Sequence, residues 1–243
     1  MIHAALIDIH TRSEGFLSAI DVEDSRLPDT VLVTAAYQPA SFTQMLFERL
    51  GIPCPARLTG AVEKRRAEYL SGRAMALAAM ALLDHPPTPV TTEPGHAPFW
   101  PKGLAGSLSH ARGRCACLLS RDTNHSYGVD TEAIASGRSL NAILAETLNA
   151  TERDRISQGV FPPATNATLT FSAKETLFKA LYPRVGHHFG FDAAELTEAP
   201  GRTSLTLSLT ADLTATLPQG TRFDIHHRLT GTHVLTWLAV PNP

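Results

Sequence analysis

The sequence predicts an α+β protein built from two halves, because segments typical of helices and segments typical of strands occur in both. The polar turn at residues 121–126 divides the chain near its middle. We therefore expect an N-terminal lobe over residues 1–124 and a C-terminal lobe over residues 125–243. The 43% of hydrophobic and 18% of charged residues are ordinary for a folded chain of 243 residues.

The first half has one clear strand and one long helix. Residues 31–37 are β-branched and apolar, which predicts a strand. Ser41 is a candidate N-cap for a helix that reaches Leu50. The longest expected helix covers residues 61–83, which are rich in Ala, Leu, Met, Glu and Arg. Prolines and glycines then predict an irregular loop over residues 91–106 that can wrap a ligand.

The second half is expected to hold three helices followed by strands. Apolar periodicity places the helices at residues 139–148, 151–157 and 168–182. Pro183 is expected to end the last helix. Alternating patterns place strands at residues 205–209, 222–229 and 232–240. The last two strands form an expected hairpin that turns at Thr230 and Gly231.

Charge and hydropathy argue against nucleic acid and membrane partners. The formal net charge is -2, and the sequence pI is near 6.6. The longest apolar run, residues 74–83, is about half of the roughly 20 residues that a membrane span needs. The opening stretch has no uninterrupted apolar segment, so we expect no targeting signal and a cytoplasmic protein. We also expect a monomer.

The cysteines are expected to be reduced core residues. Cys54, Cys115 and Cys117 make an odd count, which argues against a disulfide framework and fits a reducing compartment. Cys115 and Cys117 lie two positions apart in an expected strand at residues 115–120, so both thiols are expected on one side of it. A metal site is the alternative, but it would lack its other ligands nearby.

Two carboxylates of the second half are candidates for metal binding. Asp130 and Glu132, in the segment GVDTE, follow a short apolar approach at residues 127–129. On an extended chain, residues two positions apart point to the same face, so these carboxylates are expected side by side. Mg²⁺ prefers a few carboxylates completed by waters and phosphate oxygens. The pair is therefore a candidate Mg²⁺ platform, and a solvated strand edge is the alternative.

The expected helix that contains FSAKETLFK, residues 171–179, adds a third acid. Glu175 and Lys179 are four positions apart and stack one turn above the other, with Lys174 alongside. Such a pair can be a surface ion pair. It can also present a metal ligand or base together with an ammonium group that grips a phosphate. Spacing alone leaves both possibilities open.

Basic residues cluster on the long helix of the first half. Arg66 and Arg73 nearly superpose on a helical wheel, and Arg65 lies on another stripe. The cluster can hold a phosphate dianion, or it can be a solvated helix face. The segment GSLSH places the Ser109 hydroxyl and the His110 imidazole just after the expected loop, where a purely structural histidine is the alternative.

Four segments in this order resemble the Sfp-type class of 4'-phosphopantetheinyl transferases, and within it the branch of enterobactin synthetase component D. They are KRRAEYLSGR (64–73), APFWPKGLAGSLSH (97–110), GVDTE (128–132) and FSAKETLFK (171–179). Their joint occurrence at this separation is more specific than any one of them alone. The resemblance implies two similar α+β lobes related by a pseudo-twofold, with the active site and coenzyme A in the cleft between them.

The resemblance also implies residue roles. The N-terminal lobe would contact the nucleotide of coenzyme A, and the C-terminal lobe would hold Mg²⁺ and meet the carrier protein. The implied metal ligands are Asp130, Glu132 and Glu175. The implied coenzyme A contacts are Arg65, Arg73, Ser109, His110, Asp130, Lys174 and Lys179. The implied catalytic residues are Glu175, Lys179 and His110, with Glu175 taking the proton of the carrier serine as it attacks the β-phosphorus.

Some questions stay open at the level of sequence. Residues 93–96 read Glu-Pro-Gly-His where relatives often have a basic residue, so part of the binding of the nucleotide is expected either to be weaker or to be supplied by His96. Thr176 stands where relatives have serine. The sequence does not decide whether Arg65 or Arg66 meets the 3'-phosphate, nor between Mg²⁺ and Mn²⁺.

The resemblance implies apo carrier proteins or carrier domains as partners. It favours peptidyl or aryl carriers of siderophore assembly, and polyketide and fatty-acid carriers remain open. The main alternative function is a non-catalytic module that binds coenzyme A or a carrier protein. A second alternative is an unrelated Mg²⁺-dependent phosphohydrolase, for which the sequence shows no further Asp/His cluster.

Overall fold

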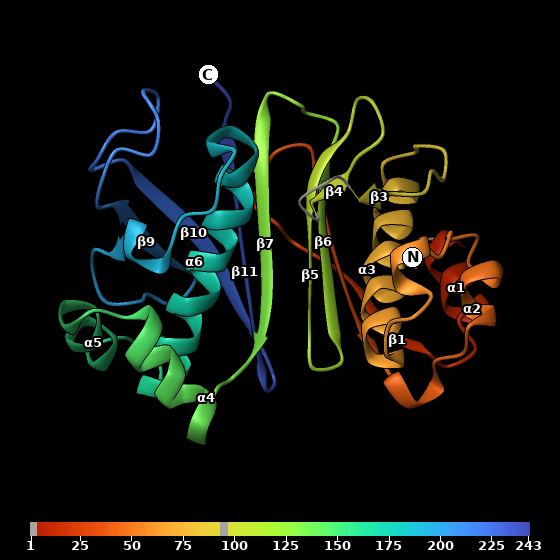
Figure 1. Cartoon of the computed structure of the whole chain (residues 1–243), viewed down its shortest axis with the longest axis horizontal. Helices are drawn as coiled ribbons and strands as arrows, with labels where there is room; N and C mark the ends of the chain where they lie inside the picture. Colours follow the sequence, from red (N-terminus) through yellow and green to blue (C-terminus); the bar gives the residue numbers. More distant parts are fainter. Residues whose placement is uncertain (1–3, 93–96) are drawn as a thin grey trace. The chain divides into compact units, whose positions relative to one another are not determined.

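The computed structural model describes residues 4–92 and 97–243 (Figure 1). Its contacts divide the chain into two compact units, Met1–Thr123 and Asn124–Pro243. Each unit contains helices and an antiparallel sheet, which confirms the predicted α+β class. The departure from the family pattern at residues 93–96 lies outside the described residues. Within the described part, no helix is both long and apolar enough to span a membrane.

The first unit is built on a four-stranded antiparallel sheet with a long helix against it. The strands, in spatial order, are β1 (Leu17–Glu23), β2 (Thr30–Tyr37), β6 (Arg114–Ser120) and β5 (Ala105–Ala111). Helix α3 (Glu63–Leu82) packs against β6, β2 and β5 (Figure 1). The remaining elements are α1 (Ala4–Arg12), α2 (Met45–Arg49) and the two-stranded ribbon of β3 (Thr91–Thr92) and β4 (Pro98–Phe99).

Small side chains let α3 lie close to the sheet. Ala74 and Ala78 are fully buried on α3 and belong to the same apolar cluster as Cys117 of β6. The three cysteines are free thiols, as expected, and Cys115 is buried beside Cys117. Burial raises the pKa of the Cys115 thiol to about 12. Burial also raises the pKa of Cys117, so both thiols are inert core residues at neutral pH.

The second unit has a five-stranded antiparallel sheet. The strands, in spatial order, are β7 (His125–Ala133), β11 (His233–Pro241), β10 (Arg222–Thr230), β9 (Ser204–Leu209) and β8 (Ala194–Leu196). Helix α6 (Pro163–Val185) packs against β7, β11, β10 and β9 (Figure 1). Ala173, Leu177 and Leu181 follow one another at four-residue spacing on α6 and are buried in this core. The short helical segments before α6 are α4 (Gly137–Ala142), the π-helical turn Ile143–Thr147 and α5 (Ala150–Ser157).

Two predicted helix boundaries are wrong. Ser41 does not cap a helix, because it ends a short 3₁₀ turn at Pro39–Ser41 and the helix α2 starts only at Met45. Phe42 has extended backbone and inserts into the core, which interrupts the expected helix. Pro183 does not end α6, since a proline near the last turn removes only one backbone bond. The helix ends at Gly186 in the left-handed region.

Other differences concern short elements. Helix α1 and strand β1 were not predicted, because residues 4–12 and 17–23 mix polar and apolar side chains. The expected loop at residues 91–106 contains the short β3–β4 ribbon. The hairpin of β10 and β11 turns at Gly231 and Thr232, one residue later than predicted, since Thr230 still pairs with His233.

Gly128 allows α6 to lie directly against β7. A Cβ atom at this position would come within 2.1 Å of the Thr176 carbonyl oxygen on α6. Real Cβ atoms do not approach a backbone oxygen so closely. The clashing atom belongs to the helix backbone, which cannot move aside as the end of a flexible side chain could. The first residue of the GVDTE segment is therefore needed for the packing of the helix.

We predict that Gly128→Ala destabilises the second unit by about 2–3 kcal/mol, because the added methyl group forces α6 away from β7. Gly72→Ala is the matched control, since a Cβ there meets nothing within 4 Å of it in α3. The control should stabilise the first unit by about 0.5–1 kcal/mol through helix propensity. Urea denaturation of both variants measures these changes, and equal effects at the two glycines would contradict the close packing at Gly128.

A buried histidine makes the second unit sensitive to acid. His227 on β10 is 3% exposed, and its Nε2 lies 3.1 Å from the Gly201 carbonyl oxygen. Its Nδ1 is buried and has no hydrogen-bond partner among the described residues. Burial lowers the pKa of His227 below its usual 6.5, against a smaller opposite effect of the hydrogen bond to Gly201.

The unfolded chain therefore binds a proton at His227 before the folded protein does. Stability from this residue is complete above about pH 6.5 and falls as the pH drops below it, by at most about 1.4 kcal/mol per unit. We predict that His227→Gln loses less stability than the wild type between pH 7 and pH 5. Urea denaturation across this range measures the two slopes, and parallel slopes would rule out His227 as the cause.

Candidate active site

The three predicted metal ligands come from two packed elements of the second unit. Asp130 lies on β7 and is 3% exposed. Glu132 is two residues further along the strand and half-buried, so the pleat turns both carboxylates to one face. Glu175 is half-buried on α6, one turn before Lys179. The contact between β7 and α6 thus gathers acidic residues that are distant in the sequence.

Lys179 and Asp130 form an ion pair across this contact. The Lys179 Nζ lies 2.7 Å from Oδ1 of Asp130 and donates a second hydrogen bond of 3.0 Å to the Val129 carbonyl oxygen. The Lys179 side chain is 27% exposed, whereas that of Asp130 is only 4% exposed. A charge-assisted bond between packed elements fixes the position of the ammonium group, although part of the Lys179 side chain is exposed.

A chain of buried hydroxyl groups holds the other oxygen of Asp130. The Ser172 hydroxyl donates to Oδ2 of Asp130 at 2.7 Å, and it lies 2.8 Å from the Thr236 hydroxyl. Thr176 continues the chain, with its hydroxyl 2.6 Å from that of Thr236. All three hydroxyl-bearing residues are fully buried. Because a carboxylate only accepts, the Ser172 proton points to Asp130, and we infer that the Thr236 hydroxyl donates to Ser172. The Thr176 hydroxyl also donates to the Thr236 carbonyl oxygen at 3.3 Å.

The sequence analysis missed these hydroxyl-bearing residues. Ser172, Thr176 and Lys179 are spaced i, i+4 and i+7 on α6, so they form one polar stripe on a largely buried helix. That stripe was the available signal. Thr236 comes from β11, and nothing in its own segment marks it.

The carboxyl group of Glu175 is held near a like charge. Burial raises its pKa, and the negative charge of Asp130 raises it further. The positive charges of Lys179 and His188 act in the opposite direction. A bound cation would relieve this repulsion, and hard carboxylate oxygens are the donors that Mg²⁺ prefers. The residue types therefore fit a Mg²⁺ ion.

The described residues do not form a metal site with three grouped protein ligands. Across residues 4–92 and 97–243, no three His, Cys, Asp or Glu side chains are grouped closely enough to hold a metal ion. Mg²⁺ usually takes only one or two protein carboxylates and completes its shell with waters and substrate phosphates. Asp130 and Glu175 are two carboxylates close enough for their charges to interact, and their roles as ligands, like that of Glu132, remain predictions.

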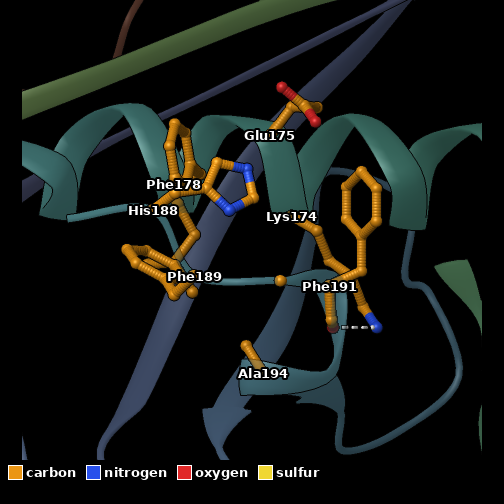
Figure 2. Close-up of a pocket in the computed structure, with 9 residues that line it drawn as sticks. Lys174, Glu175, Phe178, His188, Phe189, Phe191 and Ala194 are labelled. Carbon is orange, nitrogen blue, oxygen red and sulfur yellow. Dashed lines mark hydrogen bonds between the residues drawn. The ribbon is translucent and has the colours of Figure 1, made fainter. Parts of the chain in front are cut away.

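A small apolar pocket adjoins Glu175 (Figure 2). Its volume is about 130 Å³. The walls come from α6 and from the segment 188–194, and they include three phenylalanines, Phe178, Phe189 and Phe191. The Phe178 ring lies 4.9 Å from the Phe189 ring and 5.3 Å from the His188 imidazole. His188 is a site residue that the sequence analysis did not select.

The ammonium group of Lys174 does not lie beside the Glu175 carboxylate, although the two residues are adjacent in the sequence. Adjacent residues on a helix point about 100° apart. Figure 2 shows the Lys174 ammonium group reaching the Phe191 carbonyl on a different side of α6 from the Glu175 carboxylate. Lys174 is 5% exposed and paired with Glu152, so its placement does not support the expected contact with a pyrophosphate.

In the first unit, two of the predicted anion-binding residues lie together. The Arg65 Nη1 is 3.3 Å from the His110 Nε2, although the two residues belong to α3 and β5. Glu68 lies 3.5 Å from the same guanidinium group. Arg66 instead donates to Gln44 at 2.8 Å, and its guanidinium group stacks near Phe42. The structure therefore favours Arg65 over Arg66 as the partner of His110.

Arg73 and Ser109 are buried. The Arg73 Nε donates to the Val90 carbonyl at 2.7 Å, and its Nη2 donates to Thr91 and Thr92. Its guanidinium group lies 4.5 Å from the centre of the Tyr69 ring. Burial lowers the pKa of Arg73. The structure thus gives Arg73 a role in fixing the segment 90–92, while Ser109 is 6% exposed on β5.

We predict that Ser172→Ala lowers the free energy of unfolding by about 2 kcal/mol, because it removes a hydrogen bond to a buried carboxylate. Thr236→Val should cost about 1 kcal/mol, since it leaves the Ser172 hydroxyl without its second partner. A double-mutant cycle measured by urea denaturation should give a coupling energy of at least about 0.5 kcal/mol. Ser157→Ala, at an exposed hydroxyl of α5, is the matched control. Strict additivity of Ser172→Ala and Thr236→Val would contradict the chain.

Comparisons with known proteins cover both units. The family of the 4'-phosphopantetheinyl transferase N-terminal domain matches residues 55–120, and the 4'-phosphopantetheinyl transferase superfamily matches residues 126–236. The chain is 33% identical to enterobactin synthase component D of Salmonella typhimurium over 176 residues, which is 71% of each chain. It is 34% identical over 157 residues to the 4'-phosphopantetheinyl transferase Svp of Streptomyces mobaraensis, covering 63% of each chain.

A third relative is the 4'-phosphopantetheinyl transferase PptT of Mycobacterium tuberculosis, with 30% identity over 176 residues. The alignment covers 69% of this chain and 75% of that relative. Together these matches confirm the resemblance predicted from the four sequence segments. The chain belongs to the 4'-phosphopantetheinyl transferase superfamily.

Proposed function

We propose that this protein transfers the 4'-phosphopantetheine group of coenzyme A to a serine of an apo carrier protein and releases 3',5'-ADP, with Mg²⁺ as the metal. Family membership supports the reaction class. The observation that carries the proposal is the arrangement of Asp130, Lys179 and Glu175 on one strand and one helix. This arrangement offers acids for a cation, an ammonium group for a diphosphate and a base for a hydroxyl proton.

The metal would be held by Asp130 and Glu175, with Glu132 as the third predicted ligand. When bound, Mg²⁺ supplies positive charge that neutralises the diphosphate of the donor. Lys179 adds a second positive charge next to the same carboxylates, because its ammonium group lies 2.7 Å from Asp130 and its side chain is 27% exposed. We propose that this ammonium group binds an oxygen of the diphosphate.

Glu175 is the proposed base. Its carboxylate lines the pocket and interacts with the charges of Asp130 and Lys179, so it lies where a hydroxyl proton could be accepted beside the diphosphate. We propose that a carboxylate oxygen of Glu175 takes the proton of the carrier serine while the serine oxygen forms the new bond to phosphorus. The bond from that phosphorus to the 3',5'-ADP oxygen then breaks. Transfer of the proton to Glu175 leaves no charge on the serine oxygen in the product.

The pocket beside Glu175 suits the pantetheine arm of the donor. That arm is slender and has apolar segments, and the aromatic rings of Phe178, Phe189 and Phe191 offer an apolar wall for it. Because the pocket includes Glu175 in its lining, an arm bound there would end with its phosphate close to the proposed base.

At the nucleotide end, we propose that Arg65 and His110 bind the 3'-phosphate of coenzyme A. Their side chains already lie 3.3 Å apart, and a phosphate can accept from both. We thus propose a binding role for His110, and its expected catalytic role remains a prediction. Arg73 and Ser109 support the same end from buried positions, with Arg73 fixing Thr91 and Thr92. Their direct contact with the nucleotide remains a prediction.

The proposed partners are carrier proteins or carrier domains of nonribosomal peptide and polyketide assembly. The name of one set of relatives, enterobactin synthase component D, supports siderophore assembly as the setting. We further propose that the protein acts in the cytoplasm as a monomer. The alternatives of a binding module and a phosphohydrolase are separated from this proposal by one assay.

We predict that the protein, incubated with coenzyme A, Mg²⁺ and an apo carrier domain, increases the carrier mass by one phosphopantetheine group. Mass spectrometry of the carrier measures this directly. A binding module would leave the mass unchanged, and a hydrolase would consume coenzyme A in the absence of carrier. Removal of Mg²⁺ with a chelator should abolish the transfer.

We also predict that Glu175→Gln lowers kcat/KM for transfer by at least about a hundredfold while the unfolding midpoint changes little, because the substitution removes the base and one metal charge. Glu198→Gln is the matched control, since Glu198 forms an exposed ion pair with Arg222. Transfer by Glu175→Gln within about tenfold of wild type would overturn the assigned role.

A further inference from the structure

A buried ion pair lies behind the proposed site. The Lys174 Nζ of α6 is 2.8 Å from Oε1 of Glu152 on α5. The two side chains are 3% and 1% exposed, so both charges are removed from water. Such a pair is stable only when the remaining donors and acceptors are also satisfied. Their further partners therefore show what the pair holds in place.

Lys174 uses its other hydrogen-bond donors on two backbone carbonyls. It donates to Thr147, in the π-helical turn, and to Phe191, each at 3.0 Å. Three donors on an ammonium group match these two carbonyls and the Glu152 carboxylate. Burial lowers the pKa of Lys174, and the hydrogen bond and charge of Glu152 oppose that shift.

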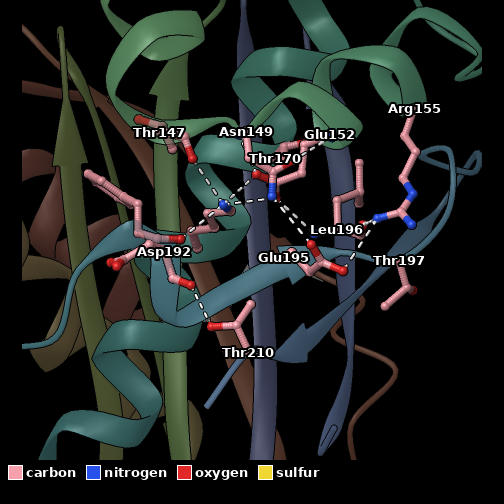
Figure 3. A network of polar contacts seen from close by, with 12 residues as sticks. Thr147, Asn149, Glu152, Arg155, Thr170, Asp192, Glu195, Leu196, Thr197 and Thr210 are labelled. Atoms are coloured by element: carbon pink, nitrogen blue, oxygen red, sulfur yellow. Dashed lines mark hydrogen bonds and ion pairs between the residues drawn. The ribbon is translucent and has the colours of Figure 1, made fainter. Parts of the chain in front are cut away.

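Glu152 connects the pair to two more segments (Figure 3). Its carboxylate accepts from the Leu196 backbone N–H on β8 at 2.8 Å and from the Asn149 N–H at 3.0 Å. Asn149 caps α5 and accepts in return from the Glu152 N–H, so the two residues form a capping box. One carboxylate thus ties the start of α5 to the edge of the sheet and to α6.

The segment held by Lys174 forms one wall of the pocket. Phe191 and Phe189 line it, and the Phe171 ring of α6 lies 5.6 Å from the Phe191 ring. Residues 186–193 contain no helix or strand longer than the 3₁₀ turn Phe191–Ala193. The bond from Lys174 to the Phe191 carbonyl anchors this wall to α6, while Thr210 binds the carbonyls of Asp192 and Ala193 next to it.

We propose that Glu152 and Lys174 are positioning residues that hold the Phe189–Phe191 wall against α6 and keep the pocket shaped for the donor. Lys174 acts through this wall and makes no contact with the diphosphate. This inference rests on the proposed transferase function, which supplies the donor. It differs from a binding role for Lys174 in one testable respect. If Lys174 is a positioning residue, the loss of activity caused by changing it should depend on whether Glu152 is still charged.

Removal of one partner leaves the other charge buried without its counter-charge, whereas removal of both charges does not. We expect Lys174→Met to lower kcat/KM for transfer by about a hundredfold. Adding Glu152→Gln to that variant should recover about tenfold of the loss, because the buried carboxylate is gone while an acceptor for Leu196 remains. A smaller recovery in the double variant overturns the proposal, since a lost diphosphate contact cannot be restored by changing Glu152.

The single variant Glu152→Gln gives a second test, which also decides the matter if Lys174→Met does not fold. The proposal predicts a loss in kcat/KM of at least about tenfold although Lys174 is still present. A binding role for Lys174 predicts a smaller loss, and that result would overturn the proposal. Glu195→Gln is the matched control in the same network, because Glu195 is 37% exposed and pairs with Arg155 at 3.8 Å.

Hydrogen exchange provides a readout that needs no turnover. Backbone amides of residues 188–193 should exchange at least about tenfold faster in Glu152→Gln than in the wild type or in Glu195→Gln. Unchanged exchange in that segment overturns the positioning role. If the wild type does not modify any apo carrier, the proposed function fails, and the exchange measurement still judges whether the pair holds the wall.

Discussion

Helix α6 and strand β7 meet along a contact that leaves no room for a side chain at position 128. The contact brings the Lys179 ammonium group and the Ser172 hydroxyl to the two oxygens of one carboxylate, that of Asp130. It also brings Glu175 close enough to Asp130 for their charges to interact. Both elements are regular and packed, so a shift of one against the other would change all of these distances together. The chemistry proposed for the site depends on this one packing distance.

Much of this contact could be predicted from the sequence. The apolar approach to GVDTE indicated the strand, and the spacing of Glu175 and Lys179 indicated one helical face. Periodicity says which residues share a face, but not what lies opposite that face. For this reason the Ser172 and Thr176 hydroxyls were missed, since their partner Thr236 comes from another strand.

Because periodicity does not show what lies opposite a helix face, the surroundings of the basic residues could not be predicted either. Arg65 and Arg73 were placed in one phosphate-binding cluster because they lie on one helix. In the structure Arg65 is exposed beside His110, while Arg73 is buried and committed to the segment that follows the helix. Lys174 and Lys179 likewise lie on one helix but have different surroundings. They are five positions apart, so their side chains point about 140° away from each other around the helix axis. One lysine faces Asp130 and the other faces Glu152.

The hydroxyl chain behind Asp130 has a consequence for how the sequence can change. Each hydroxyl has a single proton, so Ser172 gives its proton to Asp130 and can only accept from Thr236. Thr176 is two links away from Asp130, yet its hydroxyl contacts both the hydroxyl and the carbonyl oxygen of Thr236, so its loss would leave both oxygens short of a partner. Serine and threonine can replace one another at these positions, and an apolar side chain at one position favours apolar side chains at the others. We therefore expect residues 172, 176 and 236 to change in evolution as a group, even though two of them lie on α6 and the third on β11.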